Sequence, residues 1–181
     1  MFVAEELRKK NIAEYLLYMW QVEDTIRAFG CSLSRLREEY VSRFDYSEKQ
    51  QEDELDWLGN LLRMMNEEGR REHGHLQINN ATLQFLNDLH IQLLGSSKYP
   101  FYNAQYYRVL PYIVELRNKK GVHKDESEVE TCLNLLYGVL MLRLQKRELS
   151  PQTKAAVEQV SQLVGMLADY YRKDKEAPLD F

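Results

Sequence analysis

Apolar side chains recur every three or four positions along most of this chain, which is the spacing of one face of a helix. The clearest row lies in residues 11–29, with spacings of four, three, four and three. Its members are Ile12, Leu16, Met19, Glu23 and Ile26. A glutamate in the middle of an apolar row is either paired inside the protein or lies where the helix meets water or a ligand.

Serine residues mark the predicted starts of the helices that follow. Ser47 with Gln50 and Ser127 with Glu130 have the spacing of a capping box, in which each residue bonds the other's backbone amide. Two further starts are predicted by a capping serine alone and by a serine followed by a first-turn proline. These are Ser32 and Ser150-Pro151.

Glycine and proline mark the predicted ends and breaks. Gly30 closes the first helix, and Gly95 stops a later one that carries Leu76, Leu83, Leu86, His90 and Leu94. We expect Pro111 to kink or divide the next helix, because proline removes a backbone donor, and Gly121 to end it. Residues 173–181 are predicted to form a C-terminal tail.

These elements predict an all-α fold. No window alternates with a period of two over the length of a strand, and no hairpin dipeptide occurs. We expect one domain over residues 1–181, a bundle of about seven helices that are mostly antiparallel neighbours. The helix 128–147 is apolar on nearly every side, so it is predicted to be central.

Composition and charge narrow the class of protein. With 181 residues, of which 44% are hydrophobic, the chain can bury a core, and its net charge of −4 gives no general attraction to nucleic acid or anionic lipid. The longest apolar run, 135–142, is too short to cross a bilayer, and the first residues do not have the pattern of a signal peptide. We therefore expect a cytoplasmic protein, although a disulfide between Cys31 and Cys132 stays open.

Glu23 is the first candidate for function. Arg27 follows it one turn later, and a predicted helix further along the chain carries Asn79 and His90 on one face. An unpaired buried charge costs several kcal/mol, so we expect these four groups to form one polar cluster. The cluster is either a structural network that fixes the register of the helices or a binding site.

Metal and cofactor chemistry have weak support. Glu72 and His75 form one Glu-x-x-His unit, but di-iron bundles need two such units and two further glutamates. No phosphate-binding loop, nucleophile elbow or Cys–His signature occurs in the sequence. We assign no metal site and expect no cofactor.

A tyrosine-rich stretch is the second candidate. Tyrosine offers a large contact area with a polar tip, so these residues indicate either a pocket or partner surface, or a loop and helix packed over the core. The four residues are Tyr99, Tyr102, Tyr106 and Tyr107.

Three segments carry a resemblance to a known family. They are KKNIAEYLLYMWQVEDTIRA (9–28), GHLQ (74–77) and LNDLHIQLL (86–94). In these segments the chain resembles a family of Bacteroidetes proteins catalogued as domain of unknown function 4924, and the resemblance extends over the whole chain. It implies a small cytoplasmic helical protein, and the family supplies no catalytic residues to carry over.

Two functions fit the sequence. The first is a non-catalytic interaction or regulatory module that uses an exposed apolar helix face and binds a protein partner or a second copy of itself as a homodimer. The alternative is a small-ligand-binding protein or enzyme with a polar site around Glu23, Arg27 and His90, which requires a pocket of a few hundred cubic ångströms beside them. The first is the one we expect, with neither nucleic acid nor membrane as a partner.

Overall fold

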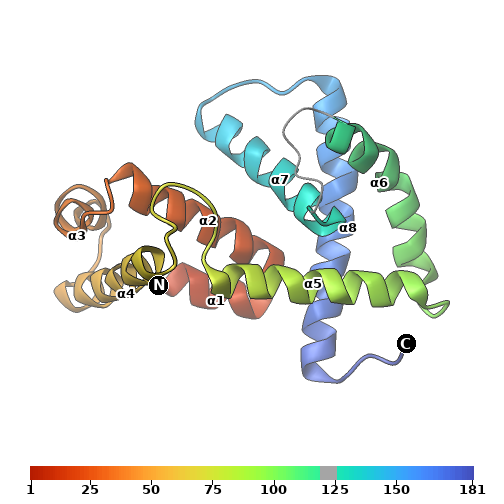
Figure 1. Cartoon of the computed structure of the whole chain (residues 1–181), viewed down its shortest axis with the longest axis horizontal. Helices are drawn as coiled ribbons and strands as arrows, with labels where there is room; N and C mark the ends of the chain where they lie inside the picture. The colour runs from red at the N-terminus through yellow and green to blue at the C-terminus, as the bar shows by residue number, and fades with distance from the viewer. Residues whose placement is uncertain (119–125) are drawn as a thin grey trace. The chain divides into compact units, whose positions relative to one another are not determined.

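The computed structural model describes residues 1–118 and 126–181, and every regular element in these residues is a helix (Figure 1). The predicted all-α fold class is confirmed. The described elements are α1 Phe2–Lys10, α2 Ile12–Ala28, α3 Leu33–Arg35, η1 Leu36–Tyr40, η2 Val41–Arg43, α4 Glu48–Glu67, α5 Gln77–Gly95, α6 Pro100–Asn118, α7 Glu128–Leu144 and α8 Pro151–Glu176.

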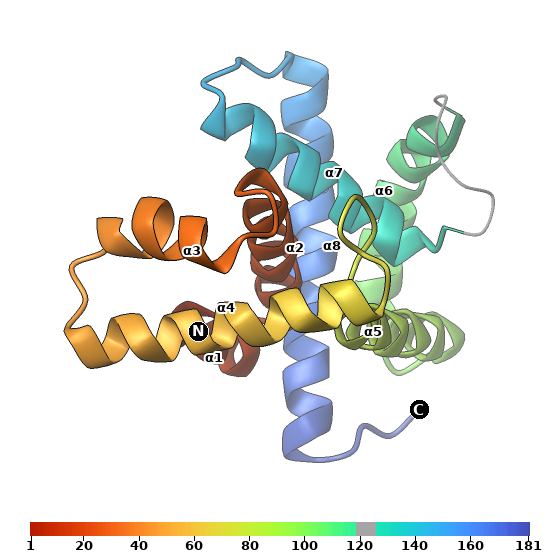
Figure 2. The ribbon, with the colours of Figure 1, turned by 60° about the vertical axis from the view of Figure 1, so that its left-hand side comes forward.

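The chain divides into two compact units. The first holds residues 1–10 and 14–81, and so contains α1, most of α2, α3 to α4 and the start of α5. Within it the short segment from α3 to η2 lies beside α4 (Figure 2). The second unit holds residues 11–13 and 82–181, which include the rest of α5 and the helices α6, α7 and α8. The single domain and the antiparallel order of neighbours stay predictions.

The predicted helix starts are confirmed by their hydrogen bonds. The Ser47 hydroxyl accepts from the Gln50 amide, and the Gln50 side chain accepts from the Ser47 amide at 3.0 Å, which completes a capping box. Ser127 caps α7 by accepting from the Glu130 amide at 3.1 Å. Ser150 caps α8, with Pro151 as its first residue. Each such cap satisfies an amide that has no partner within its helix.

Helix α1 lies outside the predicted set. Its nine residues bury only Ala4, while Phe2 packs edge-on against Tyr46 and the Met1 ammonium pairs with Glu54 at 2.6 Å. Its last turn carries Arg8, Lys9 and Lys10, whose charges suit the negative end of a helix. The N-terminal end of α1 is therefore held by contacts with α4 and with the residues that precede α4.

Helix α6 runs through Pro111 without a division. The predicted division of this helix at Pro111 is therefore wrong. Pro111 is exposed, so the carbonyl of Tyr107, which loses its helical donor, lies where water can satisfy it. The helix is described to Asn118, and Gly121 lies outside the described residues. At the other end of the chain, α8 continues to Glu176, into the segment expected to be a tail.

Each unit buries a set of large side chains. Fully buried large residues of the first unit are Leu16, Trp20, Ile26, Leu36, Leu58, Met65 and Leu76. Those of the second are Leu86, Leu93, Tyr102, Ile113 and Leu133. Burial of one such side chain contributes about 1.5–3 kcal/mol, so these residues are the main source of stability in both units.

Helix α7 is less enclosed than its sequence suggests. Val129, Cys132 and Leu133 in its first half are buried, but Leu136 is half-buried and Leu144 is 60% exposed. Apolar residues on every side of a helix thus do not mean that every side is covered. The central position of helix 128–147 stays a prediction.

Candidate functional site

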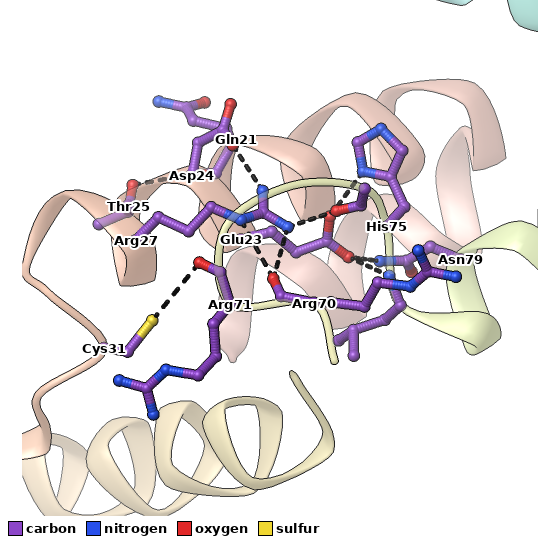
Figure 3. A network of polar contacts seen from close by, with 12 residues as sticks. Gln21, Glu23, Asp24, Thr25, Arg27, Cys31, Arg70, Arg71, His75 and Asn79 are labelled. Carbon is purple, nitrogen blue, oxygen red and sulfur yellow. Dashed lines mark hydrogen bonds and ion pairs between the residues drawn. The ribbon is translucent and has the colours of Figure 1, made fainter. Parts of the chain in front are cut away.

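Glu23 is fully buried, and its carboxylate receives three hydrogen bonds (Figure 3). The donors are the backbone amide of Leu76 at 3.0 Å, the side-chain amide of Asn79 at 2.7 Å and Nδ1 of His75 at 2.6 Å. Buried charge is tolerated when hydrogen bonds replace its hydration, and both carboxylate oxygens have donors here.

The three donors show what Glu23 does in the fold. Helix α5 begins at Gln77, so the Leu76 amide is one of the donors at its start that have no partner within the helix. Glu23 on α2 therefore caps α5 from another element and places negative charge at the positive end of the helix. The neighbouring Gln77 amide donates to Glu68 at 2.7 Å, so two carboxylates share this helix start.

Arg27, one turn further along α2, binds the loop that leads to α5. Its guanidinium donates to the carbonyl of Arg70 at 3.1 and 3.3 Å and to the carbonyl of Gly74. It also forms an ion pair with Asp24 at 2.7 Å. Gly74 has φ +80°, a left-handed conformation that favours glycine. Glu23 and Arg27 together fix the last residues of this loop and the helix after it.

His75 connects this cluster to the surface. Its ring stacks on Trp20 with centroids 4.3 Å apart and planes 15° apart, and its side chain is 27% exposed. When the imidazole is neutral, Nδ1–H donates to Glu23 and Nε2 is left as an acceptor. A carboxylate that orients a histidine in this way is found in general-base sites and behind metal ligands.

A metal site needs more ligands than this cluster provides. Across residues 1–118 and 126–181 no group of three histidine, cysteine or acidic side chains is placed to hold a metal ion. Glu72 and His75 lie in the loop between α4 and α5, not on a helix face. The stacking of His75 on Trp20 and its hydrogen bond to Glu23 both connect this loop to α2.

His90 belongs to a second polar cluster, within the second unit. Its Nδ1 lies 2.6 Å from the hydroxyl of Tyr102, and its Nε2 lies 3.4 Å from the carboxylate of Glu128. Tyr106 donates to the other oxygen of Glu128 at 3.3 Å. This cluster joins α5, α6 and the start of α7, where Glu128 also suits the helix dipole.

The pKa values in this second cluster follow from these contacts. The hydrogen bond from His90 holds the pKa of Glu128 below its usual value. Burial raises the pKa of Tyr102 far above its usual value. Burial, together with the charge of Glu128, raises the pKa of Tyr106 to about 12. Both tyrosines therefore stay protonated at neutral pH and act as hydroxyl donors.

The predicted four-residue cluster is thus divided between two networks. Glu23 and Asn79 are hydrogen-bonded, and Arg27 fixes the same loop. His90 instead has Tyr102 and Glu128 as its hydrogen-bonding partners. Sequence reasoning missed His75 as a partner of Glu23, and also Glu68 and Glu128. Glu128 had a visible signal, because it is an acid in the first turn after a predicted cap.

The four tyrosines of the tyrosine-rich stretch are divided between packed and exposed positions. Tyr102 is fully buried and Tyr106 is half-buried. Tyr99 packs edge-on against Tyr170 and donates to the carbonyl of Asp180 at 2.9 Å. Only Tyr107 among the four is strongly exposed, at 67%. The packing interpretation fits the first three, and the surface interpretation fits Tyr107.

A cavity beside His90 bears on the ligand-binding alternative. It holds about 220 Å³ outside the atoms, but only about 10 Å³ of that can take the centre of a water molecule. Such a space accommodates about one water molecule, not a metabolite. Its lining is mostly apolar: His90, Tyr102, Ile113, Glu128, Val129, Cys132, Leu163, Val164 and Leu167.

These features define a helical protein whose buried polar groups hold helix ends and a loop. The profile of a family described as a domain of unknown function (DUF4924) matches residues 1–178, so the chain belongs to that family. The resemblance noted in the sequence is thereby confirmed. Comparison with curated proteins and with solved structures found no match. In the described part of the chain, no helix has the length and apolar character needed to cross a bilayer.

Proposed function

We propose that this protein is a cytoplasmic interaction module that binds a protein partner through the outer face of α6. A cytoplasmic location is supported by Cys31 and Cys132, which are both free thiols in the structure. Nucleic acid and membrane surfaces are not proposed as partners, because the net charge of −4 gives no general attraction to nucleic acid or anionic lipid.

The observation that carries the proposal is a second apolar face on α6. The inner face packs into the second unit through Tyr102, Val109 and Ile113, all buried. The opposite face carries an outer row in which every residue is apolar or aromatic and every residue is exposed. The outer row consists of Pro100, Ala104, Tyr107, Pro111 and Val114.

The position of α6 keeps this row uncovered within its unit. Both views show α7 and α8 on the same side of α6 (Figures 1 and 2). Tyr107 is 67% exposed and Val114 is 50% exposed. A helix that is apolar on two opposite sides is typical of one buried on both. Full burial of these two side chains contributes about 1.5–3 kcal/mol each, so a partner that covers the row gains binding energy.

The polar clusters give less support to a ligand site around Glu23, Arg27 and His90. Glu23 has donors on both oxygens, and Arg27 is engaged by two loop carbonyls and Asp24. The cavity beside His90 has room for about one water molecule. These groups therefore act within the fold, and the outer row is the better candidate for contact with other molecules.

Photo-crosslinking in cells tests the proposal. A benzophenone amino acid replaces Tyr107 in the full chain, and irradiation is expected to give a covalent adduct with a protein of defined mass. The same amino acid in place of the exposed Lys154 on α8 is the position control. Val114→Ser should lower the adduct yield several-fold, and Val3→Ser, at a valine of similar exposure on α1, should not. Equal yields at positions 107 and 154, or no adduct at 107, would contradict the proposal.

A further inference from the structure

We infer that the partner is a second copy of this chain, paired through α6 with the two helices antiparallel about a twofold axis. The inference rests on the proposed function of the outer row and adds the identity and geometry of its partner. Three features of α6 carry it: the spacing of the outer row, its match to its own reverse, and the two charges beside it.

The spacing is that of a helix–helix seam. Successive members of the outer row are separated by four, three, four and three positions. This is the repeat by which one helix presents a continuous line of side chains to another helix. Any face of a helix has this spacing, but here all five positions over four turns of α6 are apolar or aromatic as well as exposed.

The row is also complementary to itself when reversed. Antiparallel pairing about a point midway between Tyr107 and Pro111 places Tyr107 of each copy against Pro111 of the other copy. The same axis sets the small Ala104 against the larger Val114 of the partner. Twofold dimers need such a self-complementary patch, since the same surface serves both copies. The pairing of a small residue with a larger one helps two helices approach closely.

Two opposite charges flank the outer row on one side. Arg108 comes directly after Tyr107, and Glu115 comes directly after Val114. The two charged residues are seven positions apart, so both lie along the same edge of the row. In an antiparallel pair this edge faces the same edge of the partner. Arg108 of each copy is then offset from Glu115 of the other by five positions, about 7.5 Å along the axis, which two long side chains can span. A parallel pair brings the opposite edges together and leaves these charges apart.

The dimer contains this Arg108–Glu115 contact twice. The two Arg108 residues also lie near each other, because they flank the twofold axis. Each guanidinium relieves that repulsion by pointing away from the axis, which is the direction of the partner's Glu115. The two attractive contacts therefore fix the orientation of the arginines as well as that of the helices.

The structure places both side chains at the surface. Arg108 and Glu115 are exposed. Within the chain, Arg108 donates to Gln105 at 3.5 Å, and Glu115 accepts from Gln152 at 3.4 Å. Because both side chains are exposed at the edge of the outer row, a partner that covers the row can contact them.

A charge-exchange experiment on the full chain tests the geometry. Sedimentation equilibrium of the wild type should show a mass that rises with concentration from one chain to two. Arg108→Glu sets two carboxylates against each other in both contacts, and Glu115→Arg sets two guanidinium groups against each other in both. Each single variant should weaken self-association about tenfold. The double variant R108E/E115R restores both attractions and should dimerise as the wild type does.

A mixture of the two single variants is the most direct test of the charge contacts. One chain then carries glutamate at both positions and the other carries arginine at both, so every contact along this edge attracts in the mixed dimer. An equimolar mixture should associate at least as strongly as the wild type, whereas each variant alone does not. Lys154→Glu, an exposed charge reversal on α8, should leave the association constant unchanged. Circular dichroism melts of all variants show whether each is folded.

Two results would overturn the inference. One is a wild-type chain that sediments as a monomer at every concentration, and the other is a mixture that associates no better than the single variants. If the crosslink at position 107 joins a different protein while the chain stays monomeric, the second-copy inference fails and the interaction module stands. If the chain is monomeric and position 107 gives no adduct, both fail.

Discussion

The role of Glu23 as a cap for α5 makes a quantitative prediction about stability. Glu23→Ala removes the acceptor of the Leu76 amide and of the Asn79 side chain, both of which are buried. Each buried donor left without a partner costs about 1–3 kcal/mol. His75 is partly exposed and can turn to water, so it adds little. The expected loss is about 3–5 kcal/mol, as for the removal of one partner from a buried charged pair.

The conservative variant separates the charge from the hydrogen bonds. Glu23→Gln keeps a side-chain oxygen for Leu76 and Asn79 but presents an amide to Nδ1 of His75. We expect it to lose about 1 kcal/mol, because the Leu76 and Asn79 hydrogen bonds lose their charge assistance but remain, and His75 can change tautomer so that Nδ1 accepts from the new amide. The order of stability should therefore be wild type, then E23Q, then E23A by a wide margin.

Chemical denaturation with a thermal melt provides the measurement. For a chain of this size the loss in E23A corresponds to a fall of about 10 °C in Tm. Glu52→Ala, at an exposed glutamate on α4, is the matched control and should stay within about 0.5 kcal/mol of the wild type. Amide exchange should show the local origin, with the Leu76 amide less protected in E23A than in the control.

The opposite outcome would refute the reasoning. Functional acids held in apolar surroundings often reduce stability, so their removal is neutral or stabilising. An E23A variant as stable as the wild type, or more stable, would show that Glu23 does not cap α5. The Glu23 and His75 pair would then need a role outside the fold.

Two further predictions concern the second unit and the thiols. Because the pKa of Glu128 is lowered in the folded state by His90, this carboxylate stabilises the protein above its ordinary pKa of 4.5, and the gain is lost as the pH falls through the lower folded value. Denaturation across this range should show Glu128→Gln less stable at pH 7 with a gap that closes in acid; a gap independent of pH would contradict the linkage. A thiol reagent should modify half-exposed Cys31 quickly and Cys132 only on unfolding, because burial raises the pKa of Cys132 to about 12, and equal rates would show that its burial is wrong.

The helical period predicted most of the fold because it depends on side chains within one element. The row around Glu23, the capping box at Ser47, the serine cap at Ser127 and the proline at the start of α8 were all visible in the sequence and lie where expected. The period of one helix does not show which of its sides are buried by other helices. This is why α7, apolar on nearly every side, has a second half in which Val139 is buried but the leucines are half-buried or exposed.

The polar partners were harder to predict for the same reason. The sequence indicated that Glu23 and His90 needed partners, and each has them. The identity of those partners depends on the path of the loop between α4 and α5 and on where α7 begins beside α6. Glu23 meets His75 because that loop returns to α2, and no spacing along the chain records such a return.

The two faces of α6 connect these observations to function. On its inner face Tyr102 and Tyr106 give their hydroxyls to His90 and Glu128, so the polar atoms of that face have partners within the unit. On its outer face Tyr107 and Val114 are exposed in a row with the repeat of a helix pair. Glu23, Arg27 and His90 all have hydrogen-bonding partners within the fold, whereas the exposed outer row is apolar. We therefore propose that the protein acts by association, with a specificity that depends on which helix matches the outer row.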